Sequence, residues 1–204
     1  MKKIFIILIL ALTVDKIFAK EITGYYINLT DDTVKINFKI TTEPLSTEIN
    51  YSSLQCGVIM YNEKHKKVYL KPEEMKEVHF DYENEHYRFV TFSQDLRLCS
   101  CFYSDKYLLR QLIDGNLKLF TYTFHNQGAM QTGGRTAMFS GEVNILQKQN
   151  GELFKIDYFN FKKTMSEYLS DCPELVTKIQ EKIYGKDDLY KIIQEYNQSC
   201  KSGK

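Results

Sequence analysis

Apolar and polar residues alternate through much of the chain between residues 20 and 158. From Thr33 to Ile40 every even-numbered residue is apolar, and Lys35, Asn37 and Lys39 lie between them. A period of two residues predicts a β-strand with one buried face and one wet face. Further strands are expected at 21–29, 53–61, 67–70, 96–103, 142–148 and 152–156.

The segment Val78–Phe92 predicts a β-hairpin with two unlike faces. Any even loop centred on Glu83-Asn84 gives the same register. In that register aromatic and aliphatic side chains share one face, and charged side chains share the other. The expected cross-strand pairs are Phe80 with Tyr87, Val78 with Phe89, Asp81 with His86 and His79 with Arg88.

The segment Tyr107–Phe124 predicts a second hairpin. Its centre, Asp114-Gly115, is typical of a type I′ turn, because that turn needs positive φ at both central residues. The expected pairs are Leu112 with Leu117, Leu109 with Phe120, Tyr107 with Tyr122 and Gln111 with Lys118.

From about Phe159 the apolar period changes from 2 to 3.6 residues, which predicts two or three short helices. Asp171 is the expected N-cap of the second helix, with Glu174 as its capping-box partner. Gly185 is expected to end that helix.

The predicted fold class is α+β: a curved, mainly antiparallel β-sheet of hairpins followed by two or three short C-terminal helices. We divide the chain into a signal peptide (1–19), an antiparallel β domain (20–158), a helical segment packed on it (159–197) and a frayed tail (198–204).

The first 19 residues have the three parts of a secretory signal peptide. A basic start is followed by an apolar run from Ile4 to Val14, and Ala19 offers a small residue at the cleavage point. The run is shorter than the roughly 20 residues of a transmembrane helix. We therefore expect export to the periplasm, the outer membrane or the exterior, with membrane contact only through the signal before cleavage; an uncleaved anchor is the alternative.

The net charge argues against nucleic acid as a partner. Without residues 1–19 the chain keeps 24 basic and 25 acidic residues, whereas nucleic acids and anionic membranes select a basic face. We expect the partner to be another envelope protein or an unidentified ligand, and we expect no cofactor.

Three side chains of the 78–92 hairpin form a candidate metal site. His79, Asp81 and His86 project from one face, and two imidazoles with a carboxylate can bind zinc or a similar ion. The alternative is a solvated strand face with an Asp81–His86 cross-strand pair, and Arg88 nearby would disfavour a cation.

The five cysteines suggest disulfides in an exported chain. Cys99 and Cys101 share a strand face and could bind a metal, pair singly with Cys56 or remain buried thiols. Cys172 precedes a helix and could be a reactive thiol. If the last two helices are antiparallel, Cys172 instead meets Cys200 in a disulfide.

The stretch 125–140 is expected to be a loop and a candidate contact surface, because it carries Gly128, Gly133, Gly134 and Arg135 with little apolar periodicity. It lacks the residue order of a phosphate-binding P-loop. The chain also contains no GxSxG elbow, no HExxH and no dinucleotide-binding fingerprint.

Several stretches of the chain resemble a group of small exported proteins of Bacteroidetes-type bacteria. Residues 24–34 are similar to the group's GYxxxxxGDTV opening, although Asp31 stands where glycine is expected. Residues 70–80, the Leu-Ile-Asp-Gly hairpin and the tail 168–175 are also similar. The resemblance implies bacterial export and a shared fold, and it implies no catalytic residues.

These observations favour a non-enzymatic, exported binding or accessory protein of the bacterial cell envelope. One alternative is a metal-dependent or thiol-dependent enzyme that uses the His79/Asp81/His86 face or Cys99 and Cys101. Another is a carrier of a small apolar ligand in a curved sheet.

Overall fold

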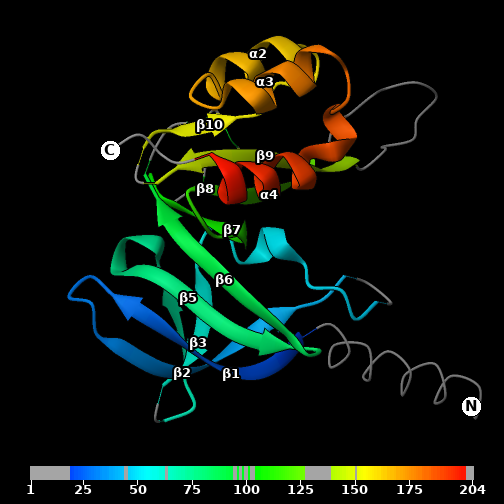
Figure 1. Ribbon diagram of the computed structural model, residues 1–204. Coiled ribbons are helices and arrows are strands. Elements are labelled where there is room, and N and C mark those ends of the chain that lie inside the picture. The colour runs from blue at the N-terminus through cyan, green and yellow to red at the C-terminus, as the bar shows by residue number, and fades with distance from the viewer. Residues whose placement is uncertain are drawn as a thin grey trace, which may run out of the picture. The chain divides into compact units, whose positions relative to one another are not determined.

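The computed structural model describes residues 19–43, 46–62, 64–93, 96, 98, 101, 104–126, 139–149 and 151–200. The chain divides into two compact units, which Figure 1 shows with their elements labelled. Unit 1 comprises residues 1–93 and 99–110, and unit 2 comprises residues 94–98 and 111–204.

All described strand pairs are antiparallel, and the hydrogen-bonded order is β10-β9-β8-β7-β6-β5-β1-β2-β3-β4. Three short α-helices follow the strands. The predicted fold class, a curved antiparallel sheet with short C-terminal helices, is therefore confirmed.

Unit 1 is built from strands, and two single-turn 3₁₀ helices interrupt them. The elements are β1 (Ala19–Asn28), β2 (Thr33–Thr41), η1 (Tyr51–Ser53), β3 (Val58–Tyr61), β4 (Lys67–Leu70), η2 (Pro72–Glu74), β5 (Met75–Tyr82), β6 (Glu85–Phe92) and the first part of β7 (Tyr107–Ile113).

The core of unit 1 is rich in aromatic side chains that alternate along the strands. Phe38, Phe80 and Phe89 are at most 2% exposed, and the Phe80 ring stacks on Tyr87 at 5.1 Å between centroids. The alternation of Thr33–Ile40 is confirmed, because Ile36, Phe38 and Ile40 are buried in this core.

The β5–β6 hairpin has the register predicted from the sequence. Val78 pairs with Phe89, Phe80 with Tyr87, His79 with Arg88 and Asp81 with His86. Glu83 and Asn84 form the turn with φ values of 50° and 67°, so two residues with positive φ join strands of right-handed twist.

The turn between β7 and β8 differs from the prediction. Gly115 has φ 147°, and Asp114 is not among the described non-glycine residues with positive φ, so the turn is not type I′. A Cβ on Gly115 would lie 2.7 Å from the side-chain nitrogen of Asn197, whose amide also bonds the backbone N and O of Leu117. This contact with the last helix explains the glycine better than the turn type does.

Unit 2 combines the remaining strands with all three helices. Its elements are the end of β7, β8 (Leu117–Asn126), β9 (Phe139–Lys148), β10 (Leu153–Lys155), α2 (Phe161–Tyr168), α3 (Pro173–Gln180), η3 (Lys186–Asp188) and α4 (Leu189–Ser199). None of the helices in the described ranges is long and apolar enough to cross a membrane.

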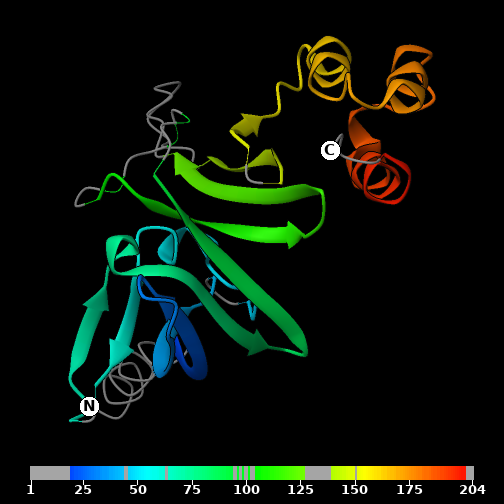
Figure 2. The same ribbon diagram turned by 60° about the vertical axis from the view of Figure 1, so that its left-hand side comes forward.

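One core joins these strands and helices. Leu119 and Leu146 of β8 and β9 cluster with Met165, Leu175 and Ile192 of the helices, and all five are completely buried. Figures 1 and 2 show α2, α3 and α4 grouped together. Strands β8 to β10 therefore belong to the unit of the helices, whereas the sequence predicts one β domain over residues 20–158.

Three sequence predictions about the helical segment change. Helix α3 ends at Gln180, with Glu181 as its C-cap, and not at Gly185. Cys172, and not Asp171, is the N-cap of α3, because the Asp171 carboxylate instead accepts hydrogen bonds from Lys148 and Tyr196. Helix α4 continues to Ser199, and Cys200 is buried, so the last helix extends into the segment expected to fray; residues 201–204 lie outside the described ranges.

Candidate ligand groove and histidine network

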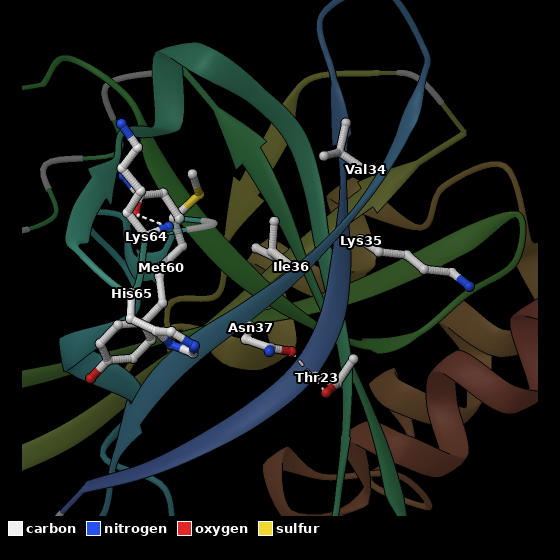
Figure 3. A pocket seen from close by; sticks show the side chains of 10 residues that line it. Thr23, Val34, Lys35, Ile36, Asn37, Met60, Lys64 and His65 are labelled. Atoms are coloured by element: carbon white, nitrogen blue, oxygen red, sulfur yellow. Dashed lines mark hydrogen bonds between the residues drawn. The ribbon is translucent and has the colours of Figure 1, made fainter.

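A groove opens in unit 1 where β3 separates from β2. The β2–β3 ladder covers Asn37 to Lys39, and beyond Asn37 the β2 residues Thr33–Ile36 pair with β1. The chain of β3 continues into a turn of residues 62–66 instead of following β2. An open groove of about 750 Å³ lies in the resulting gap (Figure 3).

The turn beside the groove is fixed by Asn62. Its side-chain oxygen accepts hydrogen bonds from the backbone N–H groups of Lys64 and Lys66, at 3.0 and 2.9 Å. His65 takes a φ of 52°. An Asx turn of this kind orders a polar loop without a core of its own, so Lys64 and His65 have a defined place at the rim.

The groove gives access to side chains from both faces of the sheet. Val34, Ile36 and Met60 line it and belong to the apolar face, where they pack in or against the core of unit 1. Thr23 and Asn37 come from the polar face, and the Thr23 hydroxyl donates to the Asn37 side chain at 2.9 Å. Figure 3 shows Ile36 and Met60 on opposite sides of the opening.

The described rim residues include two cations. Lys35 and Lys64 line the groove together with the imidazole of His65, and none of the described lining residues is acidic. The groove therefore combines an apolar floor with a cationic rim. Its volume falls within the roughly 300–1,000 Å³ range of small-molecule sites.

The residues of the predicted metal site lie on the outer face of β5 and β6 and form a chain of hydrogen bonds. His86 Nδ1 is 2.7 Å from Asp81 Oδ1, and His86 Nε2 is 3.2 Å from His79 Nδ1. His79 Nε2 in turn is 2.8 Å from Glu77 Oε2. We call these four side chains the histidine network.

Two neighbours hold the network in place. Arg88 donates to both carboxylate oxygens of Glu77, from Nε at 2.9 Å and from Nη2 at 2.7 Å. The Tyr25 ring on β1 stacks on His79, with 4.6 Å between centroids and 8° between planes. His79 is consequently buried, whereas the His86 side chain is 55% exposed.

The carboxylates at the two ends of the network set the direction of its outer hydrogen bonds. An ionised carboxylate accepts only, so His86 Nδ1 donates to Asp81 and His79 Nε2 donates to Glu77.

The pKa of Glu77 agrees with an ionised carboxylate. The hydrogen bond from His79 lowers this pKa most, burial opposes that effect, and the hydrogen bond and charge of Arg88 lower it further. The pKa of Glu77 falls to about 2.

Four cysteines form two disulfides. Cys56 is bonded to Cys101 within unit 1, so Cys101 is neither a free thiol nor a thiolate ligand. Cys172 is bonded to Cys200, as the antiparallel-helix prediction required, and it is therefore not a reactive thiol. Cys99 and the predicted contact loop with Gly128, Gly133, Gly134 and Arg135 lie outside the described residues.

Sequence reasoning missed one member of the network (Glu77), one neighbour that covers it (Tyr25) and all of the groove. Glu77 could have been found, because the two-residue period that aligns His79 and Asp81 also places Glu77 on their face. The position of Tyr25 over His79 depends on the pairing of β1 with β5. No local sequence pattern reveals the register of that pairing.

The chain was compared with models of protein families, with curated proteins and with solved structures, and none of them matches it.

Proposed function

We propose that this protein is an exported, non-enzymatic binding protein of the bacterial cell envelope, and that its ligand is a small amphipathic organic anion held in the unit 1 groove. The observation that carries the proposal is the gap between β2 and the 62–66 turn. Through this gap a ligand reaches the core side chains Val34, Ile36 and Met60.

The rim supplies the preference for an anion. Lys35 and Lys64 bring positive charge to the groove, and none of its described lining residues is acidic. An apolar group placed against the groove floor is removed from water, at roughly 25 cal/mol per Å² of buried apolar area. A carboxylate at the other end of the same ligand remains near the lysines.

Export is supported by the disulfides together with the signal-peptide pattern. Cys56–Cys101 and Cys172–Cys200 join residues 45 and 28 positions apart, and such bonds persist in oxidising compartments. The resemblance to exported Bacteroidetes-type proteins favours the same location. The intact mass of the protein produced in bacteria tests this part: a mature chain beginning at Lys20 is expected, and an uncut chain would contradict export by cleavage.

The ligand prediction is tested by calorimetric titration with decanoate, decanol and acetate. Decanoate is expected to bind at one saturable site, decanol more weakly because it lacks the charge, and acetate more weakly because it lacks the chain. The double substitution Lys35→Gln and Lys64→Gln should weaken decanoate binding roughly five- to tenfold, since exposed charge pairs contribute up to about 1 kcal/mol.

Lys67→Gln is the matched control, because Lys67 is an exposed lysine of β4 that does not line the groove. Decanoate affinity should be unchanged in this variant. An equal loss in the control, or no saturable binding of decanoate by the wild-type protein, would reject the groove as the ligand site.

A further inference from the structure

The inner nitrogens of the histidine network are placed as two ligands of one metal ion would be. His79 Nδ1 and His86 Nε2 are 3.2 Å apart. Two nitrogens bound tetrahedrally to zinc at 2.0–2.1 Å each are separated by about 3.3 Å. The separation therefore fits a single cation, provided that the two rings turn so that both nitrogens point at it.

Both outer nitrogens already have the partners that metal-binding histidines use. Metal-ligating imidazoles usually donate their other N–H to a carboxylate or carbonyl, which fixes the tautomer and the ring orientation. Here Glu77 holds His79 Nε2 at 2.8 Å and Asp81 holds His86 Nδ1 at 2.7 Å. Because the outer nitrogens are engaged by these carboxylates, the nitrogens left to bind a cation are the inner ones.

The His86 ring is much more exposed than the His79 ring. Coordination positions of a bound cation would therefore be open on the side of His86. The His79 side chain is 9% exposed and is covered by Tyr25, whereas the His86 side chain is 55% exposed. Within the described ranges no group of three or more His, Cys, Asp or Glu side chains is arranged around a metal position. A cation held by these two rings would be open to solvent on the side of His86.

The surrounding charges tolerate a dication. Glu77 and Asp81 are negative, and the positive Arg88 is engaged by both oxygens of Glu77. Tyr25, the contacting residue from β1, is neutral, and its strand partner on β2 is Lys35.

We propose that His79 Nδ1 and His86 Nε2 form a solvent-open, two-histidine site for a divalent transition-metal cation, with Glu77 and Asp81 as carboxylates that orient the ligands. The cation takes the place of the direct contact between the two inner nitrogens. Imidazole ligands suit copper, nickel and zinc, and Cu²⁺ is expected to bind more tightly than Zn²⁺. Asp81 acts through His86 and is not a direct ligand, which changes the role predicted from the sequence.

The test is calorimetric titration of the untagged protein with ZnCl₂ and CuCl₂. A Cys99→Ser background removes the remaining cysteine as a competing ligand. The expected result is one ion per chain and a higher affinity for Cu²⁺ than for Zn²⁺. His86→Asn should lower the affinity at least tenfold, and Asp81→Asn should lower it by about 10–100-fold through loss of ligand orientation.

His65→Asn is the matched control, because His65 is a described histidine in the same unit that is not part of the network. Its metal affinity should equal that of the wild type. Because His86 is largely exposed, its substitution should leave the thermal unfolding temperature of the metal-free protein nearly unchanged. Binding that survives His86→Asn, or the absence of one-to-one binding, would overturn the site. Decanoate binding is measured separately on the same variants, so failure of the groove and failure of the metal site are distinguishable.

Discussion

Units 1 and 2 use the same alternating strand pattern to build different cores. In unit 1 the buried face of each strand packs against other strands, and aromatic rings such as Phe80, Tyr87 and Phe89 stack on one another. In unit 2 the face of β8 and β9 that carries Leu117, Leu119 and Leu146 is aliphatic and packs with helices, whereas Phe120 and Tyr122 are buried on the other face of β8. An alternating strand thus predicts that one face is covered, but not what covers it.

The charged residues of the two units also differ in use. In unit 2 they join elements: Lys148 of β9 pairs with Asp171 before α3, and Lys178 of α3 pairs with Glu195 of α4. In unit 1 the most connected charged group is the histidine network with Arg88, which lies within one hairpin on an outer face. Such a network connects neighbouring strands and does not join distant elements of the chain.

The largest effects are expected from cavities in the two cores. Phe89→Ala in unit 1 should cost about 3–5 kcal/mol of unfolding free energy, and Leu175→Ala in unit 2 about 2–5 kcal/mol. Both side chains are at most 1% exposed. Amide hydrogen exchange should show lost protection mainly in the substituted unit. An equal loss of amide protection in both units would show that they unfold together. The two cores could then not be treated as independent.

The next largest losses of unfolding free energy are expected when a disulfide is removed. Replacing Cys172 and Cys200 by serine opens a link across 28 residues, and replacing Cys56 and Cys101 opens one across 45. On the chain-entropy estimate each costs about 3–4 kcal/mol. Urea unfolding followed in each pair of variants measures the loss. A cost below about 1 kcal/mol for either pair would mean that packing alone holds that unit.

The smallest effect concerns the link between β9 and the helices. Burial raises the pKa of Asp171, but hydrogen bonds from Lys148 and Tyr196 outweigh it, so the pKa lies below the ordinary value of 3.8. A lowered pKa means that the carboxylate stabilises the fold above pH 3.8, and that this contribution is lost as the pH falls further. Asp171→Asn should cost about 1 kcal/mol at pH 7.

The difference in thermal unfolding temperature between the wild type and Asp171→Asn should become smaller below pH 3.8, because the wild-type carboxyl is then protonated and neutral too. Thermal unfolding at several pH values provides the measurement. Glu152→Gln, at an exposed position of the same unit, should show no comparable loss at pH 7. If the difference in unfolding temperature stays constant down to pH 2, the ionised carboxylate is not its cause.

The sequence alone determined features that depend on neighbours along the chain. The register of Val78–Phe92 was predicted correctly because one two-residue turn and a period of two leave a single arrangement that separates apolar from charged side chains. The Cys172–Cys200 link followed from two short antiparallel helices. These features placed His79, Asp81 and His86 on one face before any tertiary information was used.

Tertiary structure decided which distant residues complete each local pattern. Asp171 has the sequence of an N-cap, yet its carboxylate bonds Lys148, which is 23 residues away. Gly115 lies in the sequence of a type I′ turn, yet its conformation accommodates Asn197. Tyr25 covers His79 only because β1 pairs with β5, and the groove exists only because β3 leaves β2 after Asn37. Pairing between distant strands is set by the sum of many contacts, so a local period cannot reveal it.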